Sequence, residues 1–233
     1  MRNCEVRDCG RLGYTEASAL QRELVDRRKR GEIPDQLLFV EHPHVITLGR
    51  NGHLENLLAS REILGRTGID FQETDRGGDI TYHGPGQIVG YPVFDLREWK
   101  RDVGAYLRAI EQAIIDTLGG FGMEAGREAG ATGVWTKQGK ICAIGVHISR
   151  WVTSHGFALN HTTDLSYFQY IVPCGLTKPV ASIQSLGRMA SRADVQSALV
   201  RELSRQFDLE MHTPTEDREP AVRKAALVTE RTL

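Results

Sequence analysis

A glycine-rich polar segment followed by an apolar run constrains the fold of this chain more than any other part of its sequence. The segment Arg76–Gln87 reads RGGDITYHGPGQ and places four glycines and one proline within twelve residues. Glycine allows the backbone to approach a ligand closely or to adopt positive φ, and proline fixes the direction in which the chain leaves. The following run Ile88–Phe94 is apolar enough for a largely buried strand, although Pro92 favours an edge position or a bulge. The sequence therefore predicts a polar loop anchored on a core strand.

A plainer interpretation of the same segment is two glycine-rich turns joined by a short strand at Ile80–Tyr82, because turns are built from these residue types. The segment is not a nucleotide fingerprint, since it has neither the lysine motif of a phosphate-binding loop nor a G-x-G-x-x-G motif that opens a helix. Composition alone does not decide between paired turns and a ligand site.

Length and composition indicate a globular protein. The 233 residues suffice for one large domain, or at most two small ones, at roughly 100–200 residues per domain. Hydrophobic residues make up 40% and charged residues 25%, and no apolar run approaches the ~20 residues of a membrane span. A net charge of −1 means that a charged partner would have to meet a local patch, and we expect neither nucleic acid nor a membrane as partner. Met1–Glu5 lacks the apolar core of a signal peptide, so the sequence predicts a cytoplasmic protein.

The cysteines and histidines give no sign of a metal site. The four cysteines, at positions 4, 9, 142 and 174, are too few and too scattered for a disulfide scaffold, and the cytoplasm would keep them reduced. His42 and His44 are two residues apart, but no third ligand follows at useful spacing. We therefore expect no metal and no other cofactor.

Capping residues and apolar periodicity predict the helices, and alternation predicts the strands. The expected N-caps are Thr15, Ser60, Asp102 and Ser191. Their helices are expected to end near Arg30, Leu64, Gly119 and Phe207. The third helix is the clearest, and its Tyr106 is expected to pack in the core. Strands are predicted at Cys4–Val6, Leu37–Glu41, Val45–Leu48, Ile69–Thr74 and His155–Asn160, with a hairpin of Thr132–Lys137 and Lys140–Ile148.

The first predicted helix carries a basic run on its polar face. The run comprises Arg22, Arg27, Arg28, Lys29 and Arg30. Such a run is either a solvated face or a surface that meets an acidic protein.

Lys140 stands at the start of the second hairpin strand. Strict alternation would place it on one face with Cys142, Ile144, Val146 and Ile148. A lysine that begins an otherwise apolar face is either a solvated strand end or a partly desolvated amine with a lowered pKa.

Cys174 lies between Pro173 and Gly175, directly after the apolar run Tyr170–Val172. A cysteine on such a loop is accessible to a substrate, although free cysteines are also among the most buried residues. From Met211 onward the sequence is polar and charged. We expect one domain over residues 1–210 and a loosely ordered tail over 211–233.

Three segments together closely resemble the lipoyl(octanoyl) transferases in order and spacing. They are Arg76–Gln87, then Gly139–Val146 with Trp151–Asn160, then Ile171–Gly175. The resemblance covers roughly residues 14–207, and its first segment is highly specific. It implies a single α/β domain of the α+β type, in which helices flank a mixed sheet as in the catalytic domain of biotin and lipoate protein ligases.

The same resemblance implies an acyltransferase for the first step of endogenous protein lipoylation. Such an enzyme moves an octanoyl or lipoyl chain from acyl carrier protein to a lysine of lipoyl domains in 2-oxoacid dehydrogenase-type complexes, or of the glycine cleavage H protein. The family's nucleophile, which forms an acyl-thioester, falls on Cys174, and its acid/base lysine falls on Lys140. Its substrate-binding residues fall on Arg76, Gly77, Gly78, Asp79, Ile80, Thr81, Tyr82, His83, Ala143, Ile144, Gly145, Gly156, Phe157 and Ala158. Cys142 is a mild departure, since a small residue such as alanine is expected there.

Three other functions remain open at this point. An ATP-dependent lipoate or biotin protein ligase would activate a free acid and need no cysteine. A non-catalytic module that binds acyl carrier protein would hold the acyl chain without transferring it. A cysteine hydrolase would need His83 or His155 to pair with Cys174, a pairing that the sequence does not show.

Overall fold

A mixed β-sheet forms the centre of the molecule, and the computed structural model describes residues 1–172 and 179–214. The sheet has the strand order β11-β1-β2-β6-β10-β9-β8-β7. These strands are β1 (Arg2–Arg11), β2 (Asp35–Glu41), β6 (Gln87–Val93), β7 (Gly126–Glu128), β8 (Ala131–Thr136), β9 (Gly139–Ser149), β10 (Val152–Asn160) and β11 (Leu209–His212). β1 pairs in parallel with β2 and β11, while β6, β9 and β10 pair antiparallel with their neighbours.

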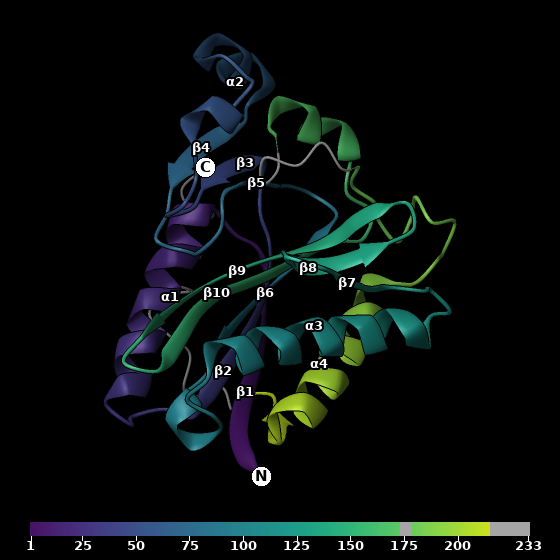
Figure 1. Cartoon of the computed structure of the whole chain (residues 1–233). Coiled ribbons are helices and arrows are strands. Elements are labelled where there is room, and N and C mark those ends of the chain that lie inside the picture. The colour runs from purple at the N-terminus through teal and green to yellow at the C-terminus, as the bar shows by residue number, and fades with distance from the viewer. Residues whose placement is uncertain (173–178, 215–233) are drawn as a thin grey trace, which may run out of the picture.

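Helices cover both faces of this sheet (Figure 1). The helices are α1 (Tyr14–Lys29), α2 (Arg61–Thr67), α3 (Val103–Gly120) and α4 (Arg192–Phe207), with short 3₁₀ turns η1 (Leu54–Asn56), η2 (Leu96–Glu98) and η3 (Leu165–Tyr170). α3 and α4 share one apolar core with the sheet, and α1 forms a second core on the opposite face. The predicted α/β fold, a mixed sheet flanked by helices, is confirmed. No helix in the described ranges is long and apolar enough to cross a membrane.

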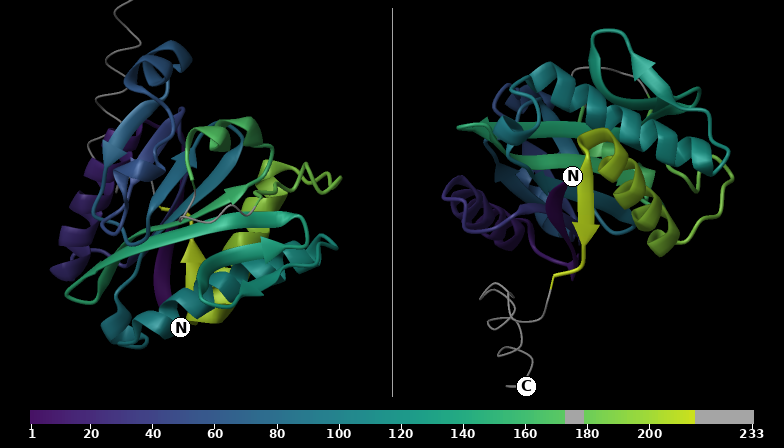
Figure 2. Two further views of the ribbon diagram at one scale, coloured as in Figure 1. Left: turned by 45° about the horizontal axis from the view of Figure 1, so that its top comes forward. Right: turned by 90° about the horizontal axis from the view of Figure 1, so that it is seen from below.

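A second, three-stranded sheet stands above one end of the large sheet (Figure 2). Its order is β4 (Asp70–Glu73), β3 (Val45–Leu48) and β5 (Ile80–His83). It has a small core of its own, built with residues of α2 and with Ile171. The loop that leads from β4 to β5 contains Arg76–Asp79, so the predicted polar loop is held between the two sheets.

Most predicted helix starts are confirmed, because N-capping is a local interaction. The side chains of Ser60, Asp102 and Ser191 accept hydrogen bonds from the backbone N–H groups of Ile63, Ala105 and Asp194 at 3.3, 3.0 and 3.0 Å. Thr15 is the wrong cap for α1. That helix begins at Tyr14, and the N–H of Gly13 donates to the Glu16 carboxylate at 3.2 Å.

Pro92 lies in a central strand, so the prediction of an edge position or a bulge is wrong. β6 runs between β2 and β10, but its pairing with β10 ends at Gly90. Beyond that point the Thr153 hydroxyl donates to the carbonyl of Pro92 at 2.8 Å and accepts from the N–H of Phe94 at 2.9 Å. A proline is tolerated in β6 because the ladder with β10 is interrupted between Gly90 and Asp95, where the Thr153 side chain supplies the bonds, and it resumes at the Asp95–Val152 pair.

An extra residue in β9 makes the predicted alternation wrong. Val134 pairs with Cys142 whereas Trp135 pairs with Lys140, which leaves Ile141 without a direct partner on β8. An extra residue in one strand shifts the facing of the residues on either side of it. Lys140 therefore does not begin the face that carries Cys142, and both Ile141 and Cys142 are fully buried.

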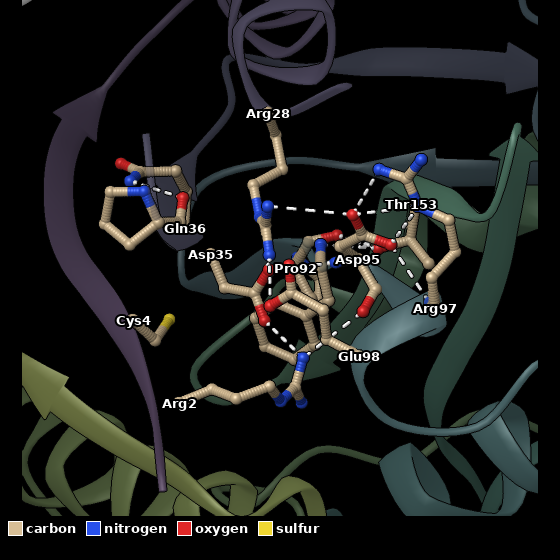
Figure 3. A network of polar contacts seen from close by, with 12 residues as sticks. Arg2, Cys4, Arg28, Asp35, Gln36, Pro92, Asp95, Arg97, Glu98 and Thr153 are labelled. Atoms are coloured by element: carbon tan, nitrogen blue, oxygen red, sulfur yellow. Dashed lines mark hydrogen bonds and ion pairs between the residues drawn. The ribbon is translucent and has the colours of Figure 1, made fainter. Parts of the chain in front are cut away.

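Arg28 is buried in the protein and does not lie on the solvated face of α1, as the sequence had predicted. Its guanidinium lies 2.8 Å from Asp35, 3.6 Å from Asp95 and 2.8 Å from Glu98 (Figure 3). The prediction is wrong because Arg28 follows Leu24 by about one helical turn and shares its buried face. Within the same basic run Arg27, Lys29 and Arg30 lie beside acidic neighbours, which offset their charge and favour a solvated face over a docking surface.

Arg28→Ala is expected to lower the free energy of unfolding by about 3 kcal/mol, because Asp35 would stay buried with less positive charge near it. Arg30→Ala is the matched control. Its partner Glu32 is exposed, so the change should stay below about 0.5 kcal/mol. Urea unfolding followed by circular dichroism measures both values, and equal losses would contradict a special role for the buried network.

Candidate active site

A pocket lies where the loop Arg76–Thr81 crosses the strands β6, β9 and β10. Most of the residues predicted to bind substrate line it, although they come from distant parts of the chain. These lining residues are Arg76, Gly78, Asp79, Ile80, Thr81, His83, Ala143, Ile144, Gly145, Gly156, Phe157 and Ala158, together with Lys140. Gly77 and Tyr82 are predicted residues that do not line it. The N–H of Gly77 donates to the Val146 carbonyl at 2.8 Å, and Tyr82 packs in the small core.

The loop is fixed on its two sides by Arg76 and Gly145. The buried Arg76 guanidinium donates to the carbonyl and the hydroxyl of Thr47 at 2.7 and 2.8 Å, which ties the loop to β3. On the other side a Cβ at position 145 would lie 2.8 Å from the Gly77 carbonyl oxygen. A glycine at 145 therefore allows the loop backbone to lie directly on β9.

Asp79 organises the loop further. Its carboxylate accepts hydrogen bonds from the N–H of His53, the side-chain amide of Asn56 and the N–H of Ile80 at 3.1, 2.6 and 2.7 Å. The carbonyl of Asn56 in turn accepts from the N–H of Val172 at 2.8 Å. Asp79 thus connects the loop, through η1, to the chain that immediately precedes Pro173.

A buried polar chain crosses the floor of the pocket. His83 Nδ1 lies 2.8 Å from Gln87 Oε1, and the Gln87 amide donates to Asn160 Oδ1 at 2.9 Å. Burial lowers the pKa of His83 to about 3, so the imidazole is neutral near pH 7 and its Nδ1–H donates to Gln87. The Asn160 amide continues the chain to the carbonyl of Ala181 at 3.0 Å. The Nδ1–H group of His83 is therefore already used in its hydrogen bond to Gln87.

One end of the pocket, beside His83, contains aromatic and imidazole side chains that were not among the residues predicted to bind substrate. Tyr14, Tyr91 and His155 line this end, and the ring centroids of Tyr14 and His83 are 6.1 Å apart. His42 stands behind them, with Nε2 2.7 Å from the Tyr91 hydroxyl. Burial lowers the pKa of His42 to about 4, so this end of the pocket is polar without charge from His42 or His83 near pH 7.

Lys140 stands at the other end of the pocket, held at a fixed position by its backbone. Its N–H donates to the Pro179 carbonyl and its carbonyl accepts from the N–H of Ala181, both at 2.9 Å. Its Nζ lies 5.1 Å from the centroid of the Trp135 ring, within range of a cation–π interaction. Cys142 is close to this amine, but burial raises the pKa of its thiol, and this effect outweighs the nearby charge of Lys140.

Cys174 lies outside the described residues, and the chain on both sides of it borders the pocket. Phe168, six positions before Cys174, and Val180, six positions after it, line the pocket. The sequence could have suggested these lining residues, because both flank the segment that contains the proposed nucleophile.

The histidines at positions 42 and 44 have different partners. His42 Nε2 lies beside Tyr91, whereas His44 Nδ1 lies 2.7 Å from the Tyr82 hydroxyl. Among the residues that the structure describes, no group of three or more His, Cys, Asp or Glu side chains is placed to hold a metal ion.

Comparison with known proteins identifies the family. The model of the lipoyl protein ligase A/B catalytic domain matches residues 13–204. The chain belongs to this family. An octanoyltransferase of Solibacter usitatus is 65% identical over 211 residues, which cover 91% of this chain and 96% of that protein. An octanoyltransferase of Koribacter versatilis is 53% identical over 204 residues, which cover 84% of this chain and 81% of that protein. As a member of the lipoyl protein ligase A/B family with these relatives, the chain is an acyltransferase.

The family fold is also evident in solved structures of low sequence identity. A bi-partite lipoate protein ligase from Thermoplasma acidophilum superposes with a TM-score of 0.77 at 19% identity, covering 96% of this chain and 92% of that one. The likeness at this identity concerns the fold alone.

Proposed function

We propose that this chain transfers an octanoyl or lipoyl chain from acyl carrier protein to a lysine of lipoyl domains and of the glycine cleavage H protein, through a thioester on Cys174. The observation that carries the proposal is the pocket with Lys140 at one end, bordered by residues on both sides of Cys174. The octanoyltransferase name of the relatives supports the acyl group.

Chain connectivity supports the pairing of Cys174 with Lys140. Cys174 is five residues before Pro179, whose carbonyl is bound to the N–H of Lys140. At no more than about 3.6 Å per residue, Cys174 is within roughly 18 Å of Pro179, the residue that is hydrogen-bonded to Lys140. The chain on the other side of Cys174 is fixed at Val172 by Asn56.

In the first half-reaction the Cys174 thiolate attacks the carbonyl carbon of the donor thioester. The acyl–sulfur bond of the donor breaks, the new thioester forms on Cys174, and the donor thiolate takes a proton from the Lys140 ammonium. Both sides of this exchange are thioesters, so the step is nearly balanced in free energy. The same ammonium favours the thiolate form of Cys174 beforehand.

In the second half-reaction the amine of the acceptor lysine attacks the acyl group on Cys174. Lys140, neutral after the first step, takes the proton of that amine, an amide forms and the Cys174 thiolate leaves. Lys140 returns to its charged state, so one residue serves as acid and as base.

We assign the acyl chain to the apolar part of the pocket, where Ile80, Ile144 and Phe157 are its main contacts. The predicted substrate-binding residues that line the pocket would surround this acyl chain. The backbone of Gly78 and Gly145 would lie close to it. Burial of each CH₂ contributes about 0.8 kcal/mol, so an eight-carbon chain gains several kcal/mol of binding.

The choice of acyl donor tests this proposal against the ATP-dependent ligases that share the fold. One such fold relative is a biotin protein ligase from Aquifex aeolicus, solved in complex with biotin and ATP. Its superposition covers 89% of this chain and 71% of that one, at 9% identity and a TM-score of 0.53. We expect a lipoyl domain to gain the mass of one octanoyl group from octanoyl-acyl carrier protein without ATP. We expect no gain from free octanoate with ATP and Mg²⁺. The reverse result, read by intact-mass spectrometry, would assign the chain to ligase chemistry.

A further inference from the structure

A second cavity adjoins the proposed acyl pocket. It is a groove between α1, the segment Gln72–Asp75 and the ends of β9 and β10 near their connecting turn. Figure 1 shows that this end of β9 and β10 lies beside α1. Of the residues described, Tyr14 and His155 line both the groove and the pocket. These two side chains therefore form the wall between the two spaces.

Both side chains of this wall are held from the groove side. The Tyr14 hydroxyl lies 3.2 Å from the hydroxyl of Thr74, and His155 Nε2 lies 2.7 Å from a carboxylate oxygen of Asp75. Thr74 and Asp75 are consecutive, and they line the groove but not the pocket. Tyr14 and His155 are each only 7% exposed as whole residues. One short segment thus fastens α1 and β10 together at the wall.

His155 has a backbone conformation that is uncommon for a residue with a side chain. Its φ is +55°, and its N–H donates to the buried Gln21 side chain at 2.7 Å. Such a conformation costs on the order of 1–3 kcal/mol and persists where the surroundings enforce it, often at ligand sites. Its Nδ1 is buried and has no hydrogen-bond partner within the described ranges.

The position of the wall fits the length of the expected acyl chain. His155 pairs with Val146, six residues beyond Lys140 along β9. At about 3.3 Å per residue, this separates the backbones of Lys140 and His155 by roughly 20 Å. With carbon–carbon bonds of about 1.5 Å, an extended eight-carbon chain is about 10 Å long and is shorter than this separation.

We propose that Tyr14 and His155 close the far end of the acyl pocket and thereby select medium-length acyl chains. This inference rests on the proposed function. A longer chain would have to displace His155 from Asp75, or press its methyl end against the imidazole and phenol groups of the wall. Displacing either side chain breaks its hydrogen bond to Thr74 or Asp75, and leaving a polar group without a partner in the interior is unfavourable. An octanoyl chain ends before it meets them.

His155→Gly is the sharpest test, because glycine adopts a φ of +55° without strain while its lack of a side chain opens the pocket into the groove. We expect kcat/KM for dodecanoyl-acyl carrier protein relative to the octanoyl donor to rise at least about tenfold. Tyr14→Ala opens the same wall from α1 and should change the ratio in the same direction. His161→Ala is the control, since His161 is a buried histidine that binds the Ala190 carbonyl at 2.7 Å and lines neither cavity. It should keep the wild-type ratio.

A binding measurement separates failure of this inference from failure of the proposed function. Isothermal titration with free octanoate and free dodecanoate gives the affinity ratio without any transfer step. We expect His155→Gly to raise the relative affinity for dodecanoate at least about tenfold. If the wild-type enzyme transferred no octanoyl group, the proposed function would be wrong. The ratio of the affinities for dodecanoate and octanoate would then still test whether Tyr14 and His155 limit the chain length. An unchanged ratio in both opened variants, each with a wild-type circular dichroism spectrum, would overturn the inference.

Discussion

Cys174→Ala is expected to lower kcat/KM for octanoyl transfer at least about 10⁴-fold, because the proposed acyl-enzyme cannot form without a nucleophile. Mixing the wild-type enzyme with octanoyl-acyl carrier protein should add the mass of one octanoyl group to the protein. The variant should show no such addition. It should still fold, because the sequence predicts that Cys174, between Pro173 and Gly175, lies on a loop outside the core. A module that only holds acyl chains would lose nothing by this change.

Cys142→Ala is the matched control for this experiment. Cys142 is fully buried, and burial raises the pKa of its thiol, so it does not supply a thiolate near pH 7. Its transfer rate should stay within about tenfold of the wild-type rate, with a loss of stability of order 1 kcal/mol from the deleted sulfur. Equal losses in the two variants would show that the reactive thiol has been assigned to the wrong cysteine.

Lys140→Arg is expected to separate the two half-reactions. Arginine keeps a positive charge and can also stack on Trp135, but it stays protonated in proteins and cannot act as a base. Arginine also cannot give a proton to the donor thiolate, but a thiolate can leave unprotonated, so formation of the octanoyl-enzyme should stay within about tenfold of wild type. Its discharge to the acceptor amine should slow by roughly 10²–10⁴-fold, the usual contribution of a positioned general base.

A single-turnover experiment measures this separation. The octanoyl-enzyme of the arginine variant should accumulate and persist when a lipoyl domain is added, whereas the wild-type intermediate should disappear. Lys137→Arg serves as control, because Lys137 is exposed on the same hairpin and pairs with Glu124 at 2.8 Å. Normal discharge by the Lys140 variant would leave Lys140 with an electrostatic role and remove it as the base.

The sequence predicted those parts of the fold whose causes are local. Asp102 and Ser191 bind backbone groups three residues away, so a short stretch of sequence contains both partners of the cap. Tyr106 belongs to a helix whose apolar spacing is regular, and it is fully buried as predicted. The strand Val45–Leu48 has the predicted bounds because three of its four residues are β-branched, which favours a strand.

The wrong predictions concern residues whose environment comes from distant segments. Arg28 was predicted to lie on the polar face of α1 with the rest of the basic run, but Asp35 and Asp95, which come from other segments, pair with it in the interior. Pro92 is acceptable in a central strand because Thr153 of β10 interrupts the ladder beside it. The extra residue at Ile141 depends on how β8 pairs with β9. None of these pairings can be read from one segment alone.

The candidate site shows the same division. The segments that resemble the transferases indicated most of one pocket wall, because glycines such as Gly145 carry a distinct pattern. Tyr14 and His155 come from α1 and β10. They are held beside the pocket by their hydrogen bonds to Thr74 and Asp75, which belong to a third segment. A positive φ at a histidine has no sequence signal, so the conformation of His155 could not have been predicted.

The pairing of β1 with β11 has a consequence for synthesis of the protein on the ribosome. β1 leaves the ribosome some two hundred residues before Leu209–His212, the strand that covers its outer edge. Until then the unpaired N–H and C=O groups of β1 can template pairing with another nascent chain. Nascent chains that stall before Leu209 should therefore aggregate or recruit chaperones, and release of the last strand should end that dependence.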